Sequence, residues 1–270
     1  MLLNKLLNID YAAVEERLKG FLTEYLEASG AKGYVIGLSG GVDSSTTAAL
    51  AVRAVGSRRV VGLLMPDPSS TPKEDVEDAL SLAESLGIEH YVIPIDRAVS
   101  ALTSSIPLYD PSDRVALGNL KARTRMLILY YTANRRDLLV LGSGDRSEIL
   151  LGYFTKYGDG GVDLLPIGDL YKTQVRRLAL HLGLPKNIAM KPSSPRLWPG
   201  HKAEEELGVR YEEADQILYA LHDLKLEPRR AAEVTGLPLE LIEMVIKRVE
   251  STAHKRQLPP VASLKGVAHP

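Results

Sequence analysis

The sequence predicts an α/β fold, in which helices flank a doubly wound parallel sheet and a C-terminal helical appendage follows. Strand-like and helix-like patterns alternate through the first half of the chain, as they do in parallel sheets. The second of these strand-like patterns, residues 59–65, is a continuous apolar run of the kind that is buried in parallel sheets. Glycine-rich polar turns follow the first and the fourth run, where such sheets bind ligands.

The spacing of apolar residues, and the glycines and prolines at element ends, place the elements of the α/β part. Leu18, Leu22 and Leu26 recur at helical spacing before Gly30, and Thr71 and Pro72 have the pattern of an N-cap and a first helical residue. The predicted strands are residues 33–38, 59–65, 90–95 and 137–141. The predicted helices are residues 10–29, 44–55, 72–86, 119–135 and 170–182, and residues 104–118 are predicted to be a loop.

The last third of the chain reads as irregular structure followed by helices. Residues 191–201 contain three prolines, and three short helices are predicted over residues 211–223, 228–235 and 238–251. We expect these helices to pack on the sheet. Residues 1–270 are therefore expected to form one domain, with an α/β core over 1–185 and the irregular and helical region over 186–270.

Composition excludes several classes of function. The 270 residues carry a net charge of −1 with scattered arginine pairs, so no nucleic-acid partner is expected. The absence of cysteine excludes disulfides and thiolate metal sites, and it is compatible with a cytoplasmic protein. No apolar run reaches about 18 residues and no signal-peptide pattern opens the chain, so no membrane association is expected.

The first glycine-rich turn, Leu38-Ser39-Gly40-Gly41-Val42-Asp43-Ser44-Ser45, is the main functional candidate. A strand, a flexible turn and a helix N-terminus together present free N–H groups to an anion such as phosphate. Asp43 would repel phosphate unless a cation lies between them, so we interpret it as a Mg²⁺ ligand. The alternative is an ordinary turn in which Asp43 or Ser44 caps the helix.

The second turn, Gly142-Ser143-Gly144-Asp145-Arg146-Ser147, nearly matches the dinucleotide pattern G-x-G-x-x-G but ends in serine. Hydride transfer is therefore disfavoured. Ser143 could instead contact ATP, and Glu148 could supply a second carboxylate to the metal of Asp43. The alternative for Glu148 is an exposed glutamate that the helix dipole favours.

Longer strings carry a family resemblance. The turn resembles the S-G-G-x-D-S signature of the N-type ATP pyrophosphatases (the PP-loop superfamily). Residues 142–169, which contain F-T-K-Y-G-D-G-G, resemble the central signature of the ammonia-dependent NAD synthetases, as do G-N-L-K-A-R-T-R-M at 118–126 and T-A-H-K-R-Q-L-P at 252–259. The resemblance covers roughly residues 10–260 and implies a Rossmann-like fold of the adenine nucleotide alpha hydrolase type.

The resemblance also implies a reaction. Members of the family form NAD⁺ from deamido-NAD⁺, ATP and ammonia through an adenylated nicotinate, and they release AMP and pyrophosphate. The family is a homodimer with its dinucleotide site at the subunit interface. Two alternatives remain: a tRNA-modifying pyrophosphatase, which the missing cysteines and balanced charge disfavour, and a non-catalytic nucleotide-binding module, which would need neither Asp43 nor Glu148.

Site residues follow from the same resemblance, position by position. ATP would contact Gly37, Leu38, Ser39, Gly40, Gly41, Val42, Asp43, Ser44, Ser143, Lys172 and Ser194. Ser193 is the alternative to Ser194 for the last of these contacts. Deamido-NAD⁺ would contact Tyr25, Arg123, Lys156, Asp159, Asp163, His254 and Lys255. Mg²⁺ would be held by Asp43 and Glu148.

No general acid or base is assigned, because ammonia brings its own protons. Singly, Arg123 and Lys172 could be surface charges and Tyr25 a packed aromatic.

The loop over residues 153–168 is glycine-rich and carries Lys156 just before Gly158-Asp159-Gly160-Gly161. A loop of that composition is predicted to be either a disordered link or a lid that becomes ordered when a ligand binds.

Overall fold

A computed structural model describes residues 2–265 and 267. Among these residues, four strands form one parallel sheet in the order β3-β2-β1-β4. They are β1 (Gly33–Gly37), β2 (Val60–Leu64), β3 (Glu89–Val92) and β4 (Leu138–Leu141). The strand order reverses at β1, which has β2 on one side and β4 on the other. The doubly wound sheet is therefore confirmed, and its switch point lies beside the first glycine-rich turn.

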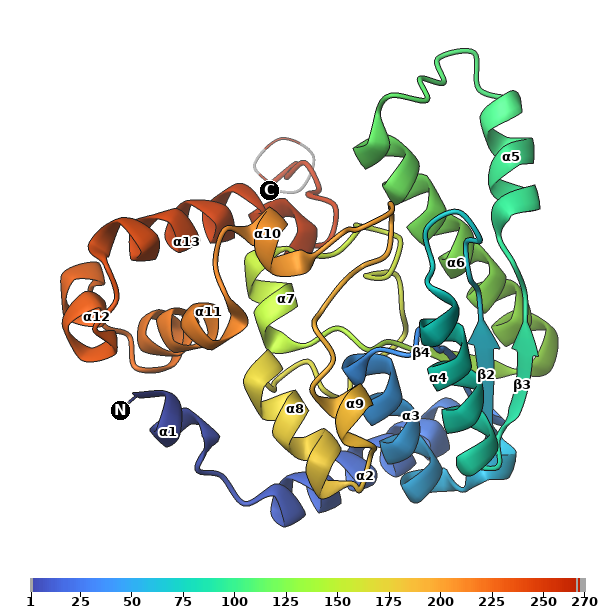
Figure 1. Cartoon of the computed structure of the whole chain (residues 1–270), viewed down its shortest axis with the longest axis horizontal. Coiled ribbons are helices and arrows are strands. Elements are labelled where there is room, and N and C mark those ends of the chain that lie inside the picture. The colour runs from blue at the N-terminus through green and yellow to red at the C-terminus, as the bar shows by residue number, and fades with distance from the viewer. Residues whose placement is uncertain (1, 266, 268–270) are drawn as a thin grey trace.

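Alternate residues of the strands face two hydrophobic clusters. Tyr34 and Ile36 pack with the helices α2 (Tyr11–Ser29), α3 (Val42–Val55), α4 (Lys73–Ser85) and α8 (Lys172–His181) on one face of the sheet. Val35 and Val140 pack with α5 (Asp96–Ser104) and α6 (Arg114–Arg136) on the other. Figure 1 shows this layered arrangement. Because both faces are covered there, β1, β2 and β4 are apolar, whereas the edge strand β3 carries Glu89 and His90 and is largely exposed.

Two predicted helix starts were wrong. The helix predicted from residue 119 begins at Arg114, because the Asp113 side chain caps it by accepting a hydrogen bond from Ala116 N at 2.9 Å. Gly118 therefore lies inside α6, not in a loop. Pro72 is the N-cap of α4 and not its first helical residue. The short helices α1 (Leu2–Leu7), α5, α9 (Lys186–Ala189) and α10 (Ala203–Leu207) were not predicted.

The C-terminal helices do not pack on the sheet as expected. They are α11 (Tyr211–Leu218), a π-helical turn (Tyr219–Asp223), α12 (Pro228–Thr235) and α13 (Leu239–Ser251). Their apolar side chains form a separate cluster with α1 and with Leu151 of α7 (Arg146–Leu151). The N-terminal helix and the last helices thus share one core, which lies beside α7 and α8 (Figure 1).

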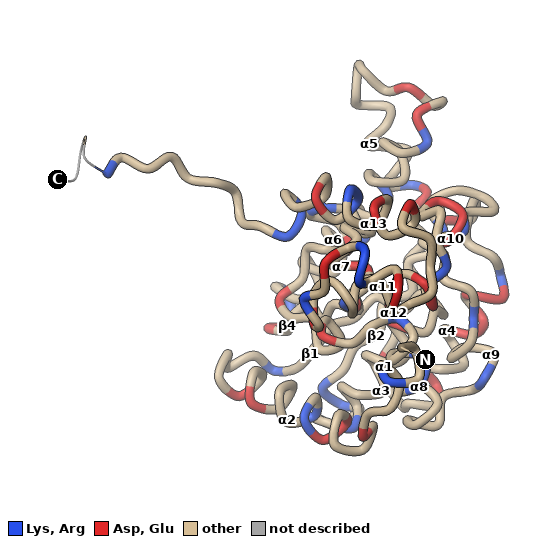
Figure 2. Tube along the Cα trace, turned by 90° about the vertical axis from the view of Figure 1, so that its left-hand side faces the viewer, with Lys and Arg blue, Asp and Glu red and all other residues tan. Residues whose placement is uncertain are grey.

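The surface carries intermixed charges. In Figure 2, basic and acidic residues alternate over the trace, and a chain segment after the last helical turn (Ala253–Arg256) extends away from the body. Among the described residues, no helix is both long enough and apolar enough to cross a membrane.

Candidate functional site: a phosphate turn beside a carboxylate cluster

The first glycine-rich turn forms the end of β1 and the start of α3. Gly40 has a φ of +73°, and a Cβ there would lie 2.2 Å from the Asp75 carbonyl oxygen, so only glycine is accommodated. The helix N-cap is Gly41, which has no side chain to satisfy the first N–H groups. Capping by Asp43 or Ser44 is therefore wrong, and the helix N-terminus remains open to an anion.

Three carboxylates meet beside this turn. Asp43, Asp145 and Glu148 each place one oxygen within 4.8 Å of the other two. The Lys172 ammonium joins them, with Nζ at 2.6 Å from Asp43 Oδ2 and 2.8 Å from both Asp145 Oδ2 and Glu148 Oε1. The Lys172 and Asp145 side chains are fully buried, whereas those of Asp43 and Glu148 are partly exposed. The pair proposed from the sequence is thus half of a larger cluster.

The charges of this cluster do not cancel. With every group ionised, three carboxylates and one ammonium sum to −2. Burial, opposed by Lys172, combines with repulsion from the other carboxylates to raise the pKa of Glu148 and of Asp145. Burial opposes the charge of Lys172, but the three carboxylates raise its pKa well above the usual value.

The donor set fits a divalent metal. Asp43 Oδ1 is buried and has no hydrogen-bond partner among the described residues. Asp43 and Glu148 also line the neighbouring cavity, while Lys172 approaches from the protein interior. Carboxylate oxygens on the solvent side are the ligands that Mg²⁺ takes beside nucleotide phosphates.

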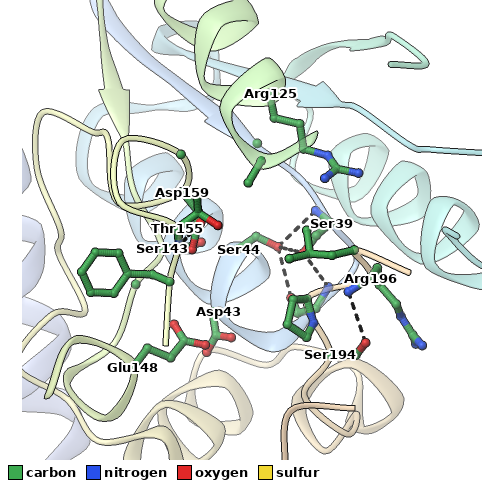
Figure 3. A pocket seen from close by; sticks show the side chains of 18 of the residues that line it. Ser39, Asp43, Ser44, Arg125, Ser143, Glu148, Thr155, Asp159, Ser194 and Arg196 are labelled. Carbon is green, nitrogen blue, oxygen red and sulfur yellow. Dashed lines mark hydrogen bonds between the residues drawn. The ribbon is translucent and has the colours of Figure 1, made fainter. Parts of the chain in front are cut away.

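A cavity of about 410 Å³ opens in front of the turn and the cluster. In Figure 3, Asp43 and Glu148 point toward one another on one side, and Ser39, Ser194 and Arg196 lie on the other. Twelve of the residues predicted as site residues line it: Gly37, Leu38, Ser39, Gly41, Val42, Asp43, Ser44, Ser143, Glu148, Asp159, Ser194 and Lys255. Its location at the carboxyl ends of β1 and β4 is the one predicted for a doubly wound sheet.

Comparison with known proteins assigns the chain to a family. The family model described as NAD synthase matches residues 14–259. The chain belongs to the NAD synthase family. It is 57% identical over 258 residues, 96% of this chain and 93% of its relative, to a protein of Hyperthermus butylicus named NH(3)-dependent NAD(+) synthetase. A protein of that name from Methanosarcina mazei is 45% identical over 95% of this chain and all of its own length.

Solved structures agree with this membership. An NMN synthetase from Francisella tularensis has a TM-score of 0.82 and 34% identity, covering 94% of this chain and 99% of its own. An NH3-dependent NAD synthetase from Campylobacter jejuni has a TM-score of 0.80 and 33% identity, covering 94% and 100%. The predicted Rossmann-like fold of the PP-loop type is thus confirmed, and so is a ligase of NAD biosynthesis that uses ATP as co-substrate.

The predicted lid, residues 153–168, is folded against its surroundings. Asp159 Oδ1 accepts a hydrogen bond from Thr155 N at 2.8 Å, and Thr155 Oγ1 donates to Asn119 at 2.7 Å. Burial raises the pKa of Asp159, although the Thr155 bond opposes this. Lys156 Nζ donates to the His254 carbonyl at 2.7 Å and Lys255 Nζ to the Phe154 carbonyl at 2.7 Å, so the C-terminal tail holds the lid.

Seven predicted contact residues do not line the cavity: Gly40, Lys172, Tyr25, Arg123, Lys156, Asp163 and His254. Gly40 shapes the turn, and Lys172 lies behind the carboxylates. Asp163 accepts hydrogen bonds from Val140 N at 2.7 Å and from the Tyr130 hydroxyl at 3.0 Å. For these residues a ligand contact stays a prediction.

The hydrogen bonds of Ser193 and Ser194 bear on which of the two serines contacts ATP. Ser194 Oγ donates to the His201 carbonyl, so this hydroxyl is already engaged. Ser193 Oγ is buried and has no hydrogen-bond partner among the described residues. Both serines line the cavity, and the assignment to Ser194 stays a prediction.

Sequence reasoning missed several residues in and beside the cavity. Arg125 donates from Nε to the Met65 carbonyl at 2.9 Å, and burial lowers the pKa of its guanidinium. Trp198 stacks on His201 with ring centroids 3.5 Å apart. The tryptophan in the proline-rich segment was a usable signal, because an isolated large aromatic in an irregular segment needs a packing partner. Asp145 belongs to the second glycine-rich turn, which the sequence analysis singled out. Its ion pair with Lys172, 27 residues later, could not be predicted from sequence spacing.

Proposed function

We propose that this chain amidates deamido-NAD⁺ with ammonia, consumes ATP, and releases NAD⁺, AMP and pyrophosphate. The observation that carries the proposal is the open N-terminus of α3 beside three carboxylates, in a chain of the NAD synthase family. Relatives at 51–57% identity over 93–98% of this chain are named NH(3)-dependent NAD(+) synthetase.

The chemistry requires an activated carboxyl group. An oxygen of the nicotinate carboxylate forms a bond to the α-phosphorus of ATP, and the bond to pyrophosphate breaks. Ammonia then attacks the carbonyl carbon of the mixed anhydride, loses a proton to form the amide, and AMP leaves. Positioning and charge neutralisation account for most of the catalysis that a protein supplies to such a step at phosphorus.

The residues of the turn fit the first step. The N–H groups at the start of α3 and the hydroxyls of Ser39 and Ser44 would bind the phosphates of ATP. Mg²⁺, which supplies positive charge against the phosphates, would be held by Asp43 and Glu148. Lys172 would keep these two carboxylates in place from behind.

The dinucleotide would bind beyond the lid and across a homodimer. Leu127 and Tyr131 lie on α6 with 58% and 73% of their surfaces exposed, and Tyr25 is 39% exposed. Exposed large apolar side chains are enriched at subunit interfaces. We propose that a second copy covers them and that Tyr25, Arg123, Lys156, Asp159, Asp163, His254 and Lys255 contact deamido-NAD⁺.

We further propose that residues 1–270 act as a single domain. The supporting observation is that α1 shares a hydrophobic cluster with α11 and α13, so the N-terminal helix packs with the C-terminal helices. We place the enzyme in the cytoplasm, where its co-substrate ATP is available.

The test is an incubation with ATP, Mg²⁺, ammonium and deamido-NAD⁺, in which NAD⁺ and AMP are measured. Equal amounts of both products are expected, and none without Mg²⁺. AMP release without NAD⁺ would contradict the amidation step, and no reaction across a range of pH and salt would contradict the assignment.

A second candidate substrate is nicotinate mononucleotide, because the Francisella structure is an NMN synthetase. The two candidates share the same chemistry at the carboxyl group and differ in the adenylate half of the dinucleotide. Parallel assays with both substrates at equal concentration should show the higher kcat/KM for deamido-NAD⁺. A higher value for the mononucleotide would replace the first candidate.

A further inference from the structure

The loop over residues 191–198 forms one wall of the cavity, opposite the carboxylate cluster (Figure 3). Two of its side chains are basic, Lys191 and Arg196, and both line the cavity. Both reach the same carboxylate of α4. Lys191 Nζ lies 3.0 Å from Asp75 Oδ1, and Arg196 Nε lies 2.7 Å from Asp75 Oδ2.

Asp75 contacts two parts of the cavity wall, the phosphate turn and the 191–198 loop. Only 5% of its surface is exposed, although it bears a charge and belongs to the first turn of a helix. Its backbone is in contact with the phosphate turn, because a Cβ on Gly40 would lie 2.2 Å from the Asp75 carbonyl oxygen. The same residue therefore contacts the phosphate turn through its main chain and the 191–198 loop through its side chain.

The loop backbone has separate anchors. Ser70 Oγ donates to the Arg196 carbonyl at 2.9 Å, and Lys121 Nζ donates to the Leu197 carbonyl at 3.1 Å. Lys121 is itself paired with Asp67 at 2.5 Å, with both side chains at most 8% exposed. These contacts hold the far end of the loop near α6, and Asp75 holds its side chains toward the phosphate turn.

The two basic residues depend on Asp75 to different degrees. Lys191 has a second carboxylate partner, Asp78, at 2.5 Å. Asp75 is the one carboxylate paired with Arg196 among the described residues. Arg196 also has a φ of +53°, a conformation that a non-glycine residue keeps only when its surroundings hold it. Removal of the Asp75 charge should therefore release Arg196 first.

We propose that Asp75 is a positioning residue for ATP binding. Through Arg196 and Lys191, the Asp75 carboxylate holds the 191–198 loop against the phosphate turn. It acts through these residues and through the turn, not on the reacting atoms. The proposal rests on the proposed function for its kinetic consequence, whereas its structural consequence concerns the chain alone.

The structural consequence is tested by limited trypsin digestion without ligands, followed by mass spectrometry. Trypsin can cut the Arg196–Leu197 bond, whereas the bond after Lys191 is protected by Pro192. Asp75→Asn should be cut after Arg196 on the order of tenfold faster than the wild type, as expected for local opening of a held segment. Cleavage after Lys225, in an exposed turn elsewhere, should be unchanged.

Asp78→Asn is the matched control, because it removes a carboxylate from Lys191 and leaves the pair of Arg196 intact. It should be cut after Arg196 at close to the wild-type rate. Equal rates in Asp75→Asn and the wild type would overturn the proposal, as would equal acceleration after Arg196 and Lys225, which indicates global unfolding. If Asp75→Asn does not fold, Arg196→Gln should give faster hydrogen exchange over residues 191–198, and unchanged exchange would overturn the proposal.

The kinetic consequence is a selective change in the use of ATP. Asp75→Asn should raise the KM for ATP on the order of tenfold, because a displaced loop no longer completes the nucleotide site. The KM for deamido-NAD⁺ should stay within about twofold. An unchanged KM for ATP would overturn the positioning role. A wild type that makes no NAD⁺ would contradict the proposed function but leave the digestion result interpretable.

Discussion

The carboxyl group of Asp215 offers a quantitative test of how the helical region supports the site. Asp215 lies on α11 and is fully buried. It accepts hydrogen bonds from Ser147 Oγ at 2.5 Å and from Thr173 N at 2.8 Å. Ser147 Oγ in turn accepts from Lys172 N at 2.9 Å. Asp215 therefore fixes the start of α8, from which Lys172 reaches the carboxylate cluster.

The magnitude follows from the pKa of this group. Burial, partly offset by the hydrogen bonds of Ser147 and Thr173, raises the pKa of Asp215 from 3.8 to about 7. At about 1.36 kcal/mol per pKa unit, the folded state is penalised by about 4 kcal/mol once the group is ionised in both states. Below pH 3.8 the contribution is zero. It grows as the pH rises from about 4 to 7, because the unfolded chain releases the proton first, and it is constant above 7.

The perturbation is Asp215→Asn, which removes the charge and keeps the size. At pH 4.5 Asp215 is protonated in the folded state and, like the amide, offers one carbonyl acceptor, so the unfolding free energies of the two proteins should differ by no more than about 1 kcal/mol. At pH 8 the asparagine should be stabilising, because the penalty of the buried charge is gone. Denaturant unfolding of both proteins between pH 4.5 and 8.5 measures the difference. A difference that does not vary with pH would refute the reasoning.

The other predictions concern the cluster and the interface. Asp43→Asn and Glu148→Gln should each lower kcat on the order of a hundredfold and raise the Mg²⁺ concentration needed for AMP release, and a normal Mg²⁺ titration in both would contradict the metal assignment. Lys172→Met should lower the unfolding free energy in EDTA by about 3 to 5 kcal/mol, because three carboxylates lose their counter-charge; unchanged denaturant unfolding would contradict this. Tyr131→Asp should give a monomer in sedimentation, unlike Val261→Asp on the extended tail, and a dimer in both would exclude this face.

The fold was predictable because its signals are local. Four short apolar runs mark four strands, and each strand was placed to within two residues at its N-terminal end and three at its C-terminal end. The start of α6 was misplaced because Gly118 is unfavourable in helices. The Asp113 cap outweighs this preference, and Gly118 packs against Leu197, where a Cβ would lie 3.0 Å from its Cβ. That packing partner is distant in sequence and left no local trace.

The site was predictable in part for the same reason. The phosphate turn is a continuous segment, so its strand, glycines and helix start could be recognised together. The network around Asp75 joins α4 to a loop more than 115 residues later, and the Lys172 pair with Asp43 spans 129 residues. No spacing rule connects such positions, because the topology of the sheet and not the local chain brings them together.

The position of Lys172 changes the interpretation of the whole cluster. A lysine that reached the phosphates directly would leave Asp43, Asp145 and Glu148 with a charge of −3. In the structure, its ammonium lies between them on the buried side and reduces the charge to −2, with Asp43 and Glu148 still facing the cavity. That residual charge matches one divalent cation. Burial of a lysine is costly unless it is paired, and here three partners lie within 2.8 Å. We therefore interpret Lys172 as the residue that orients the two metal-facing carboxylates, and Asp145 as the carboxylate that keeps Lys172 charged.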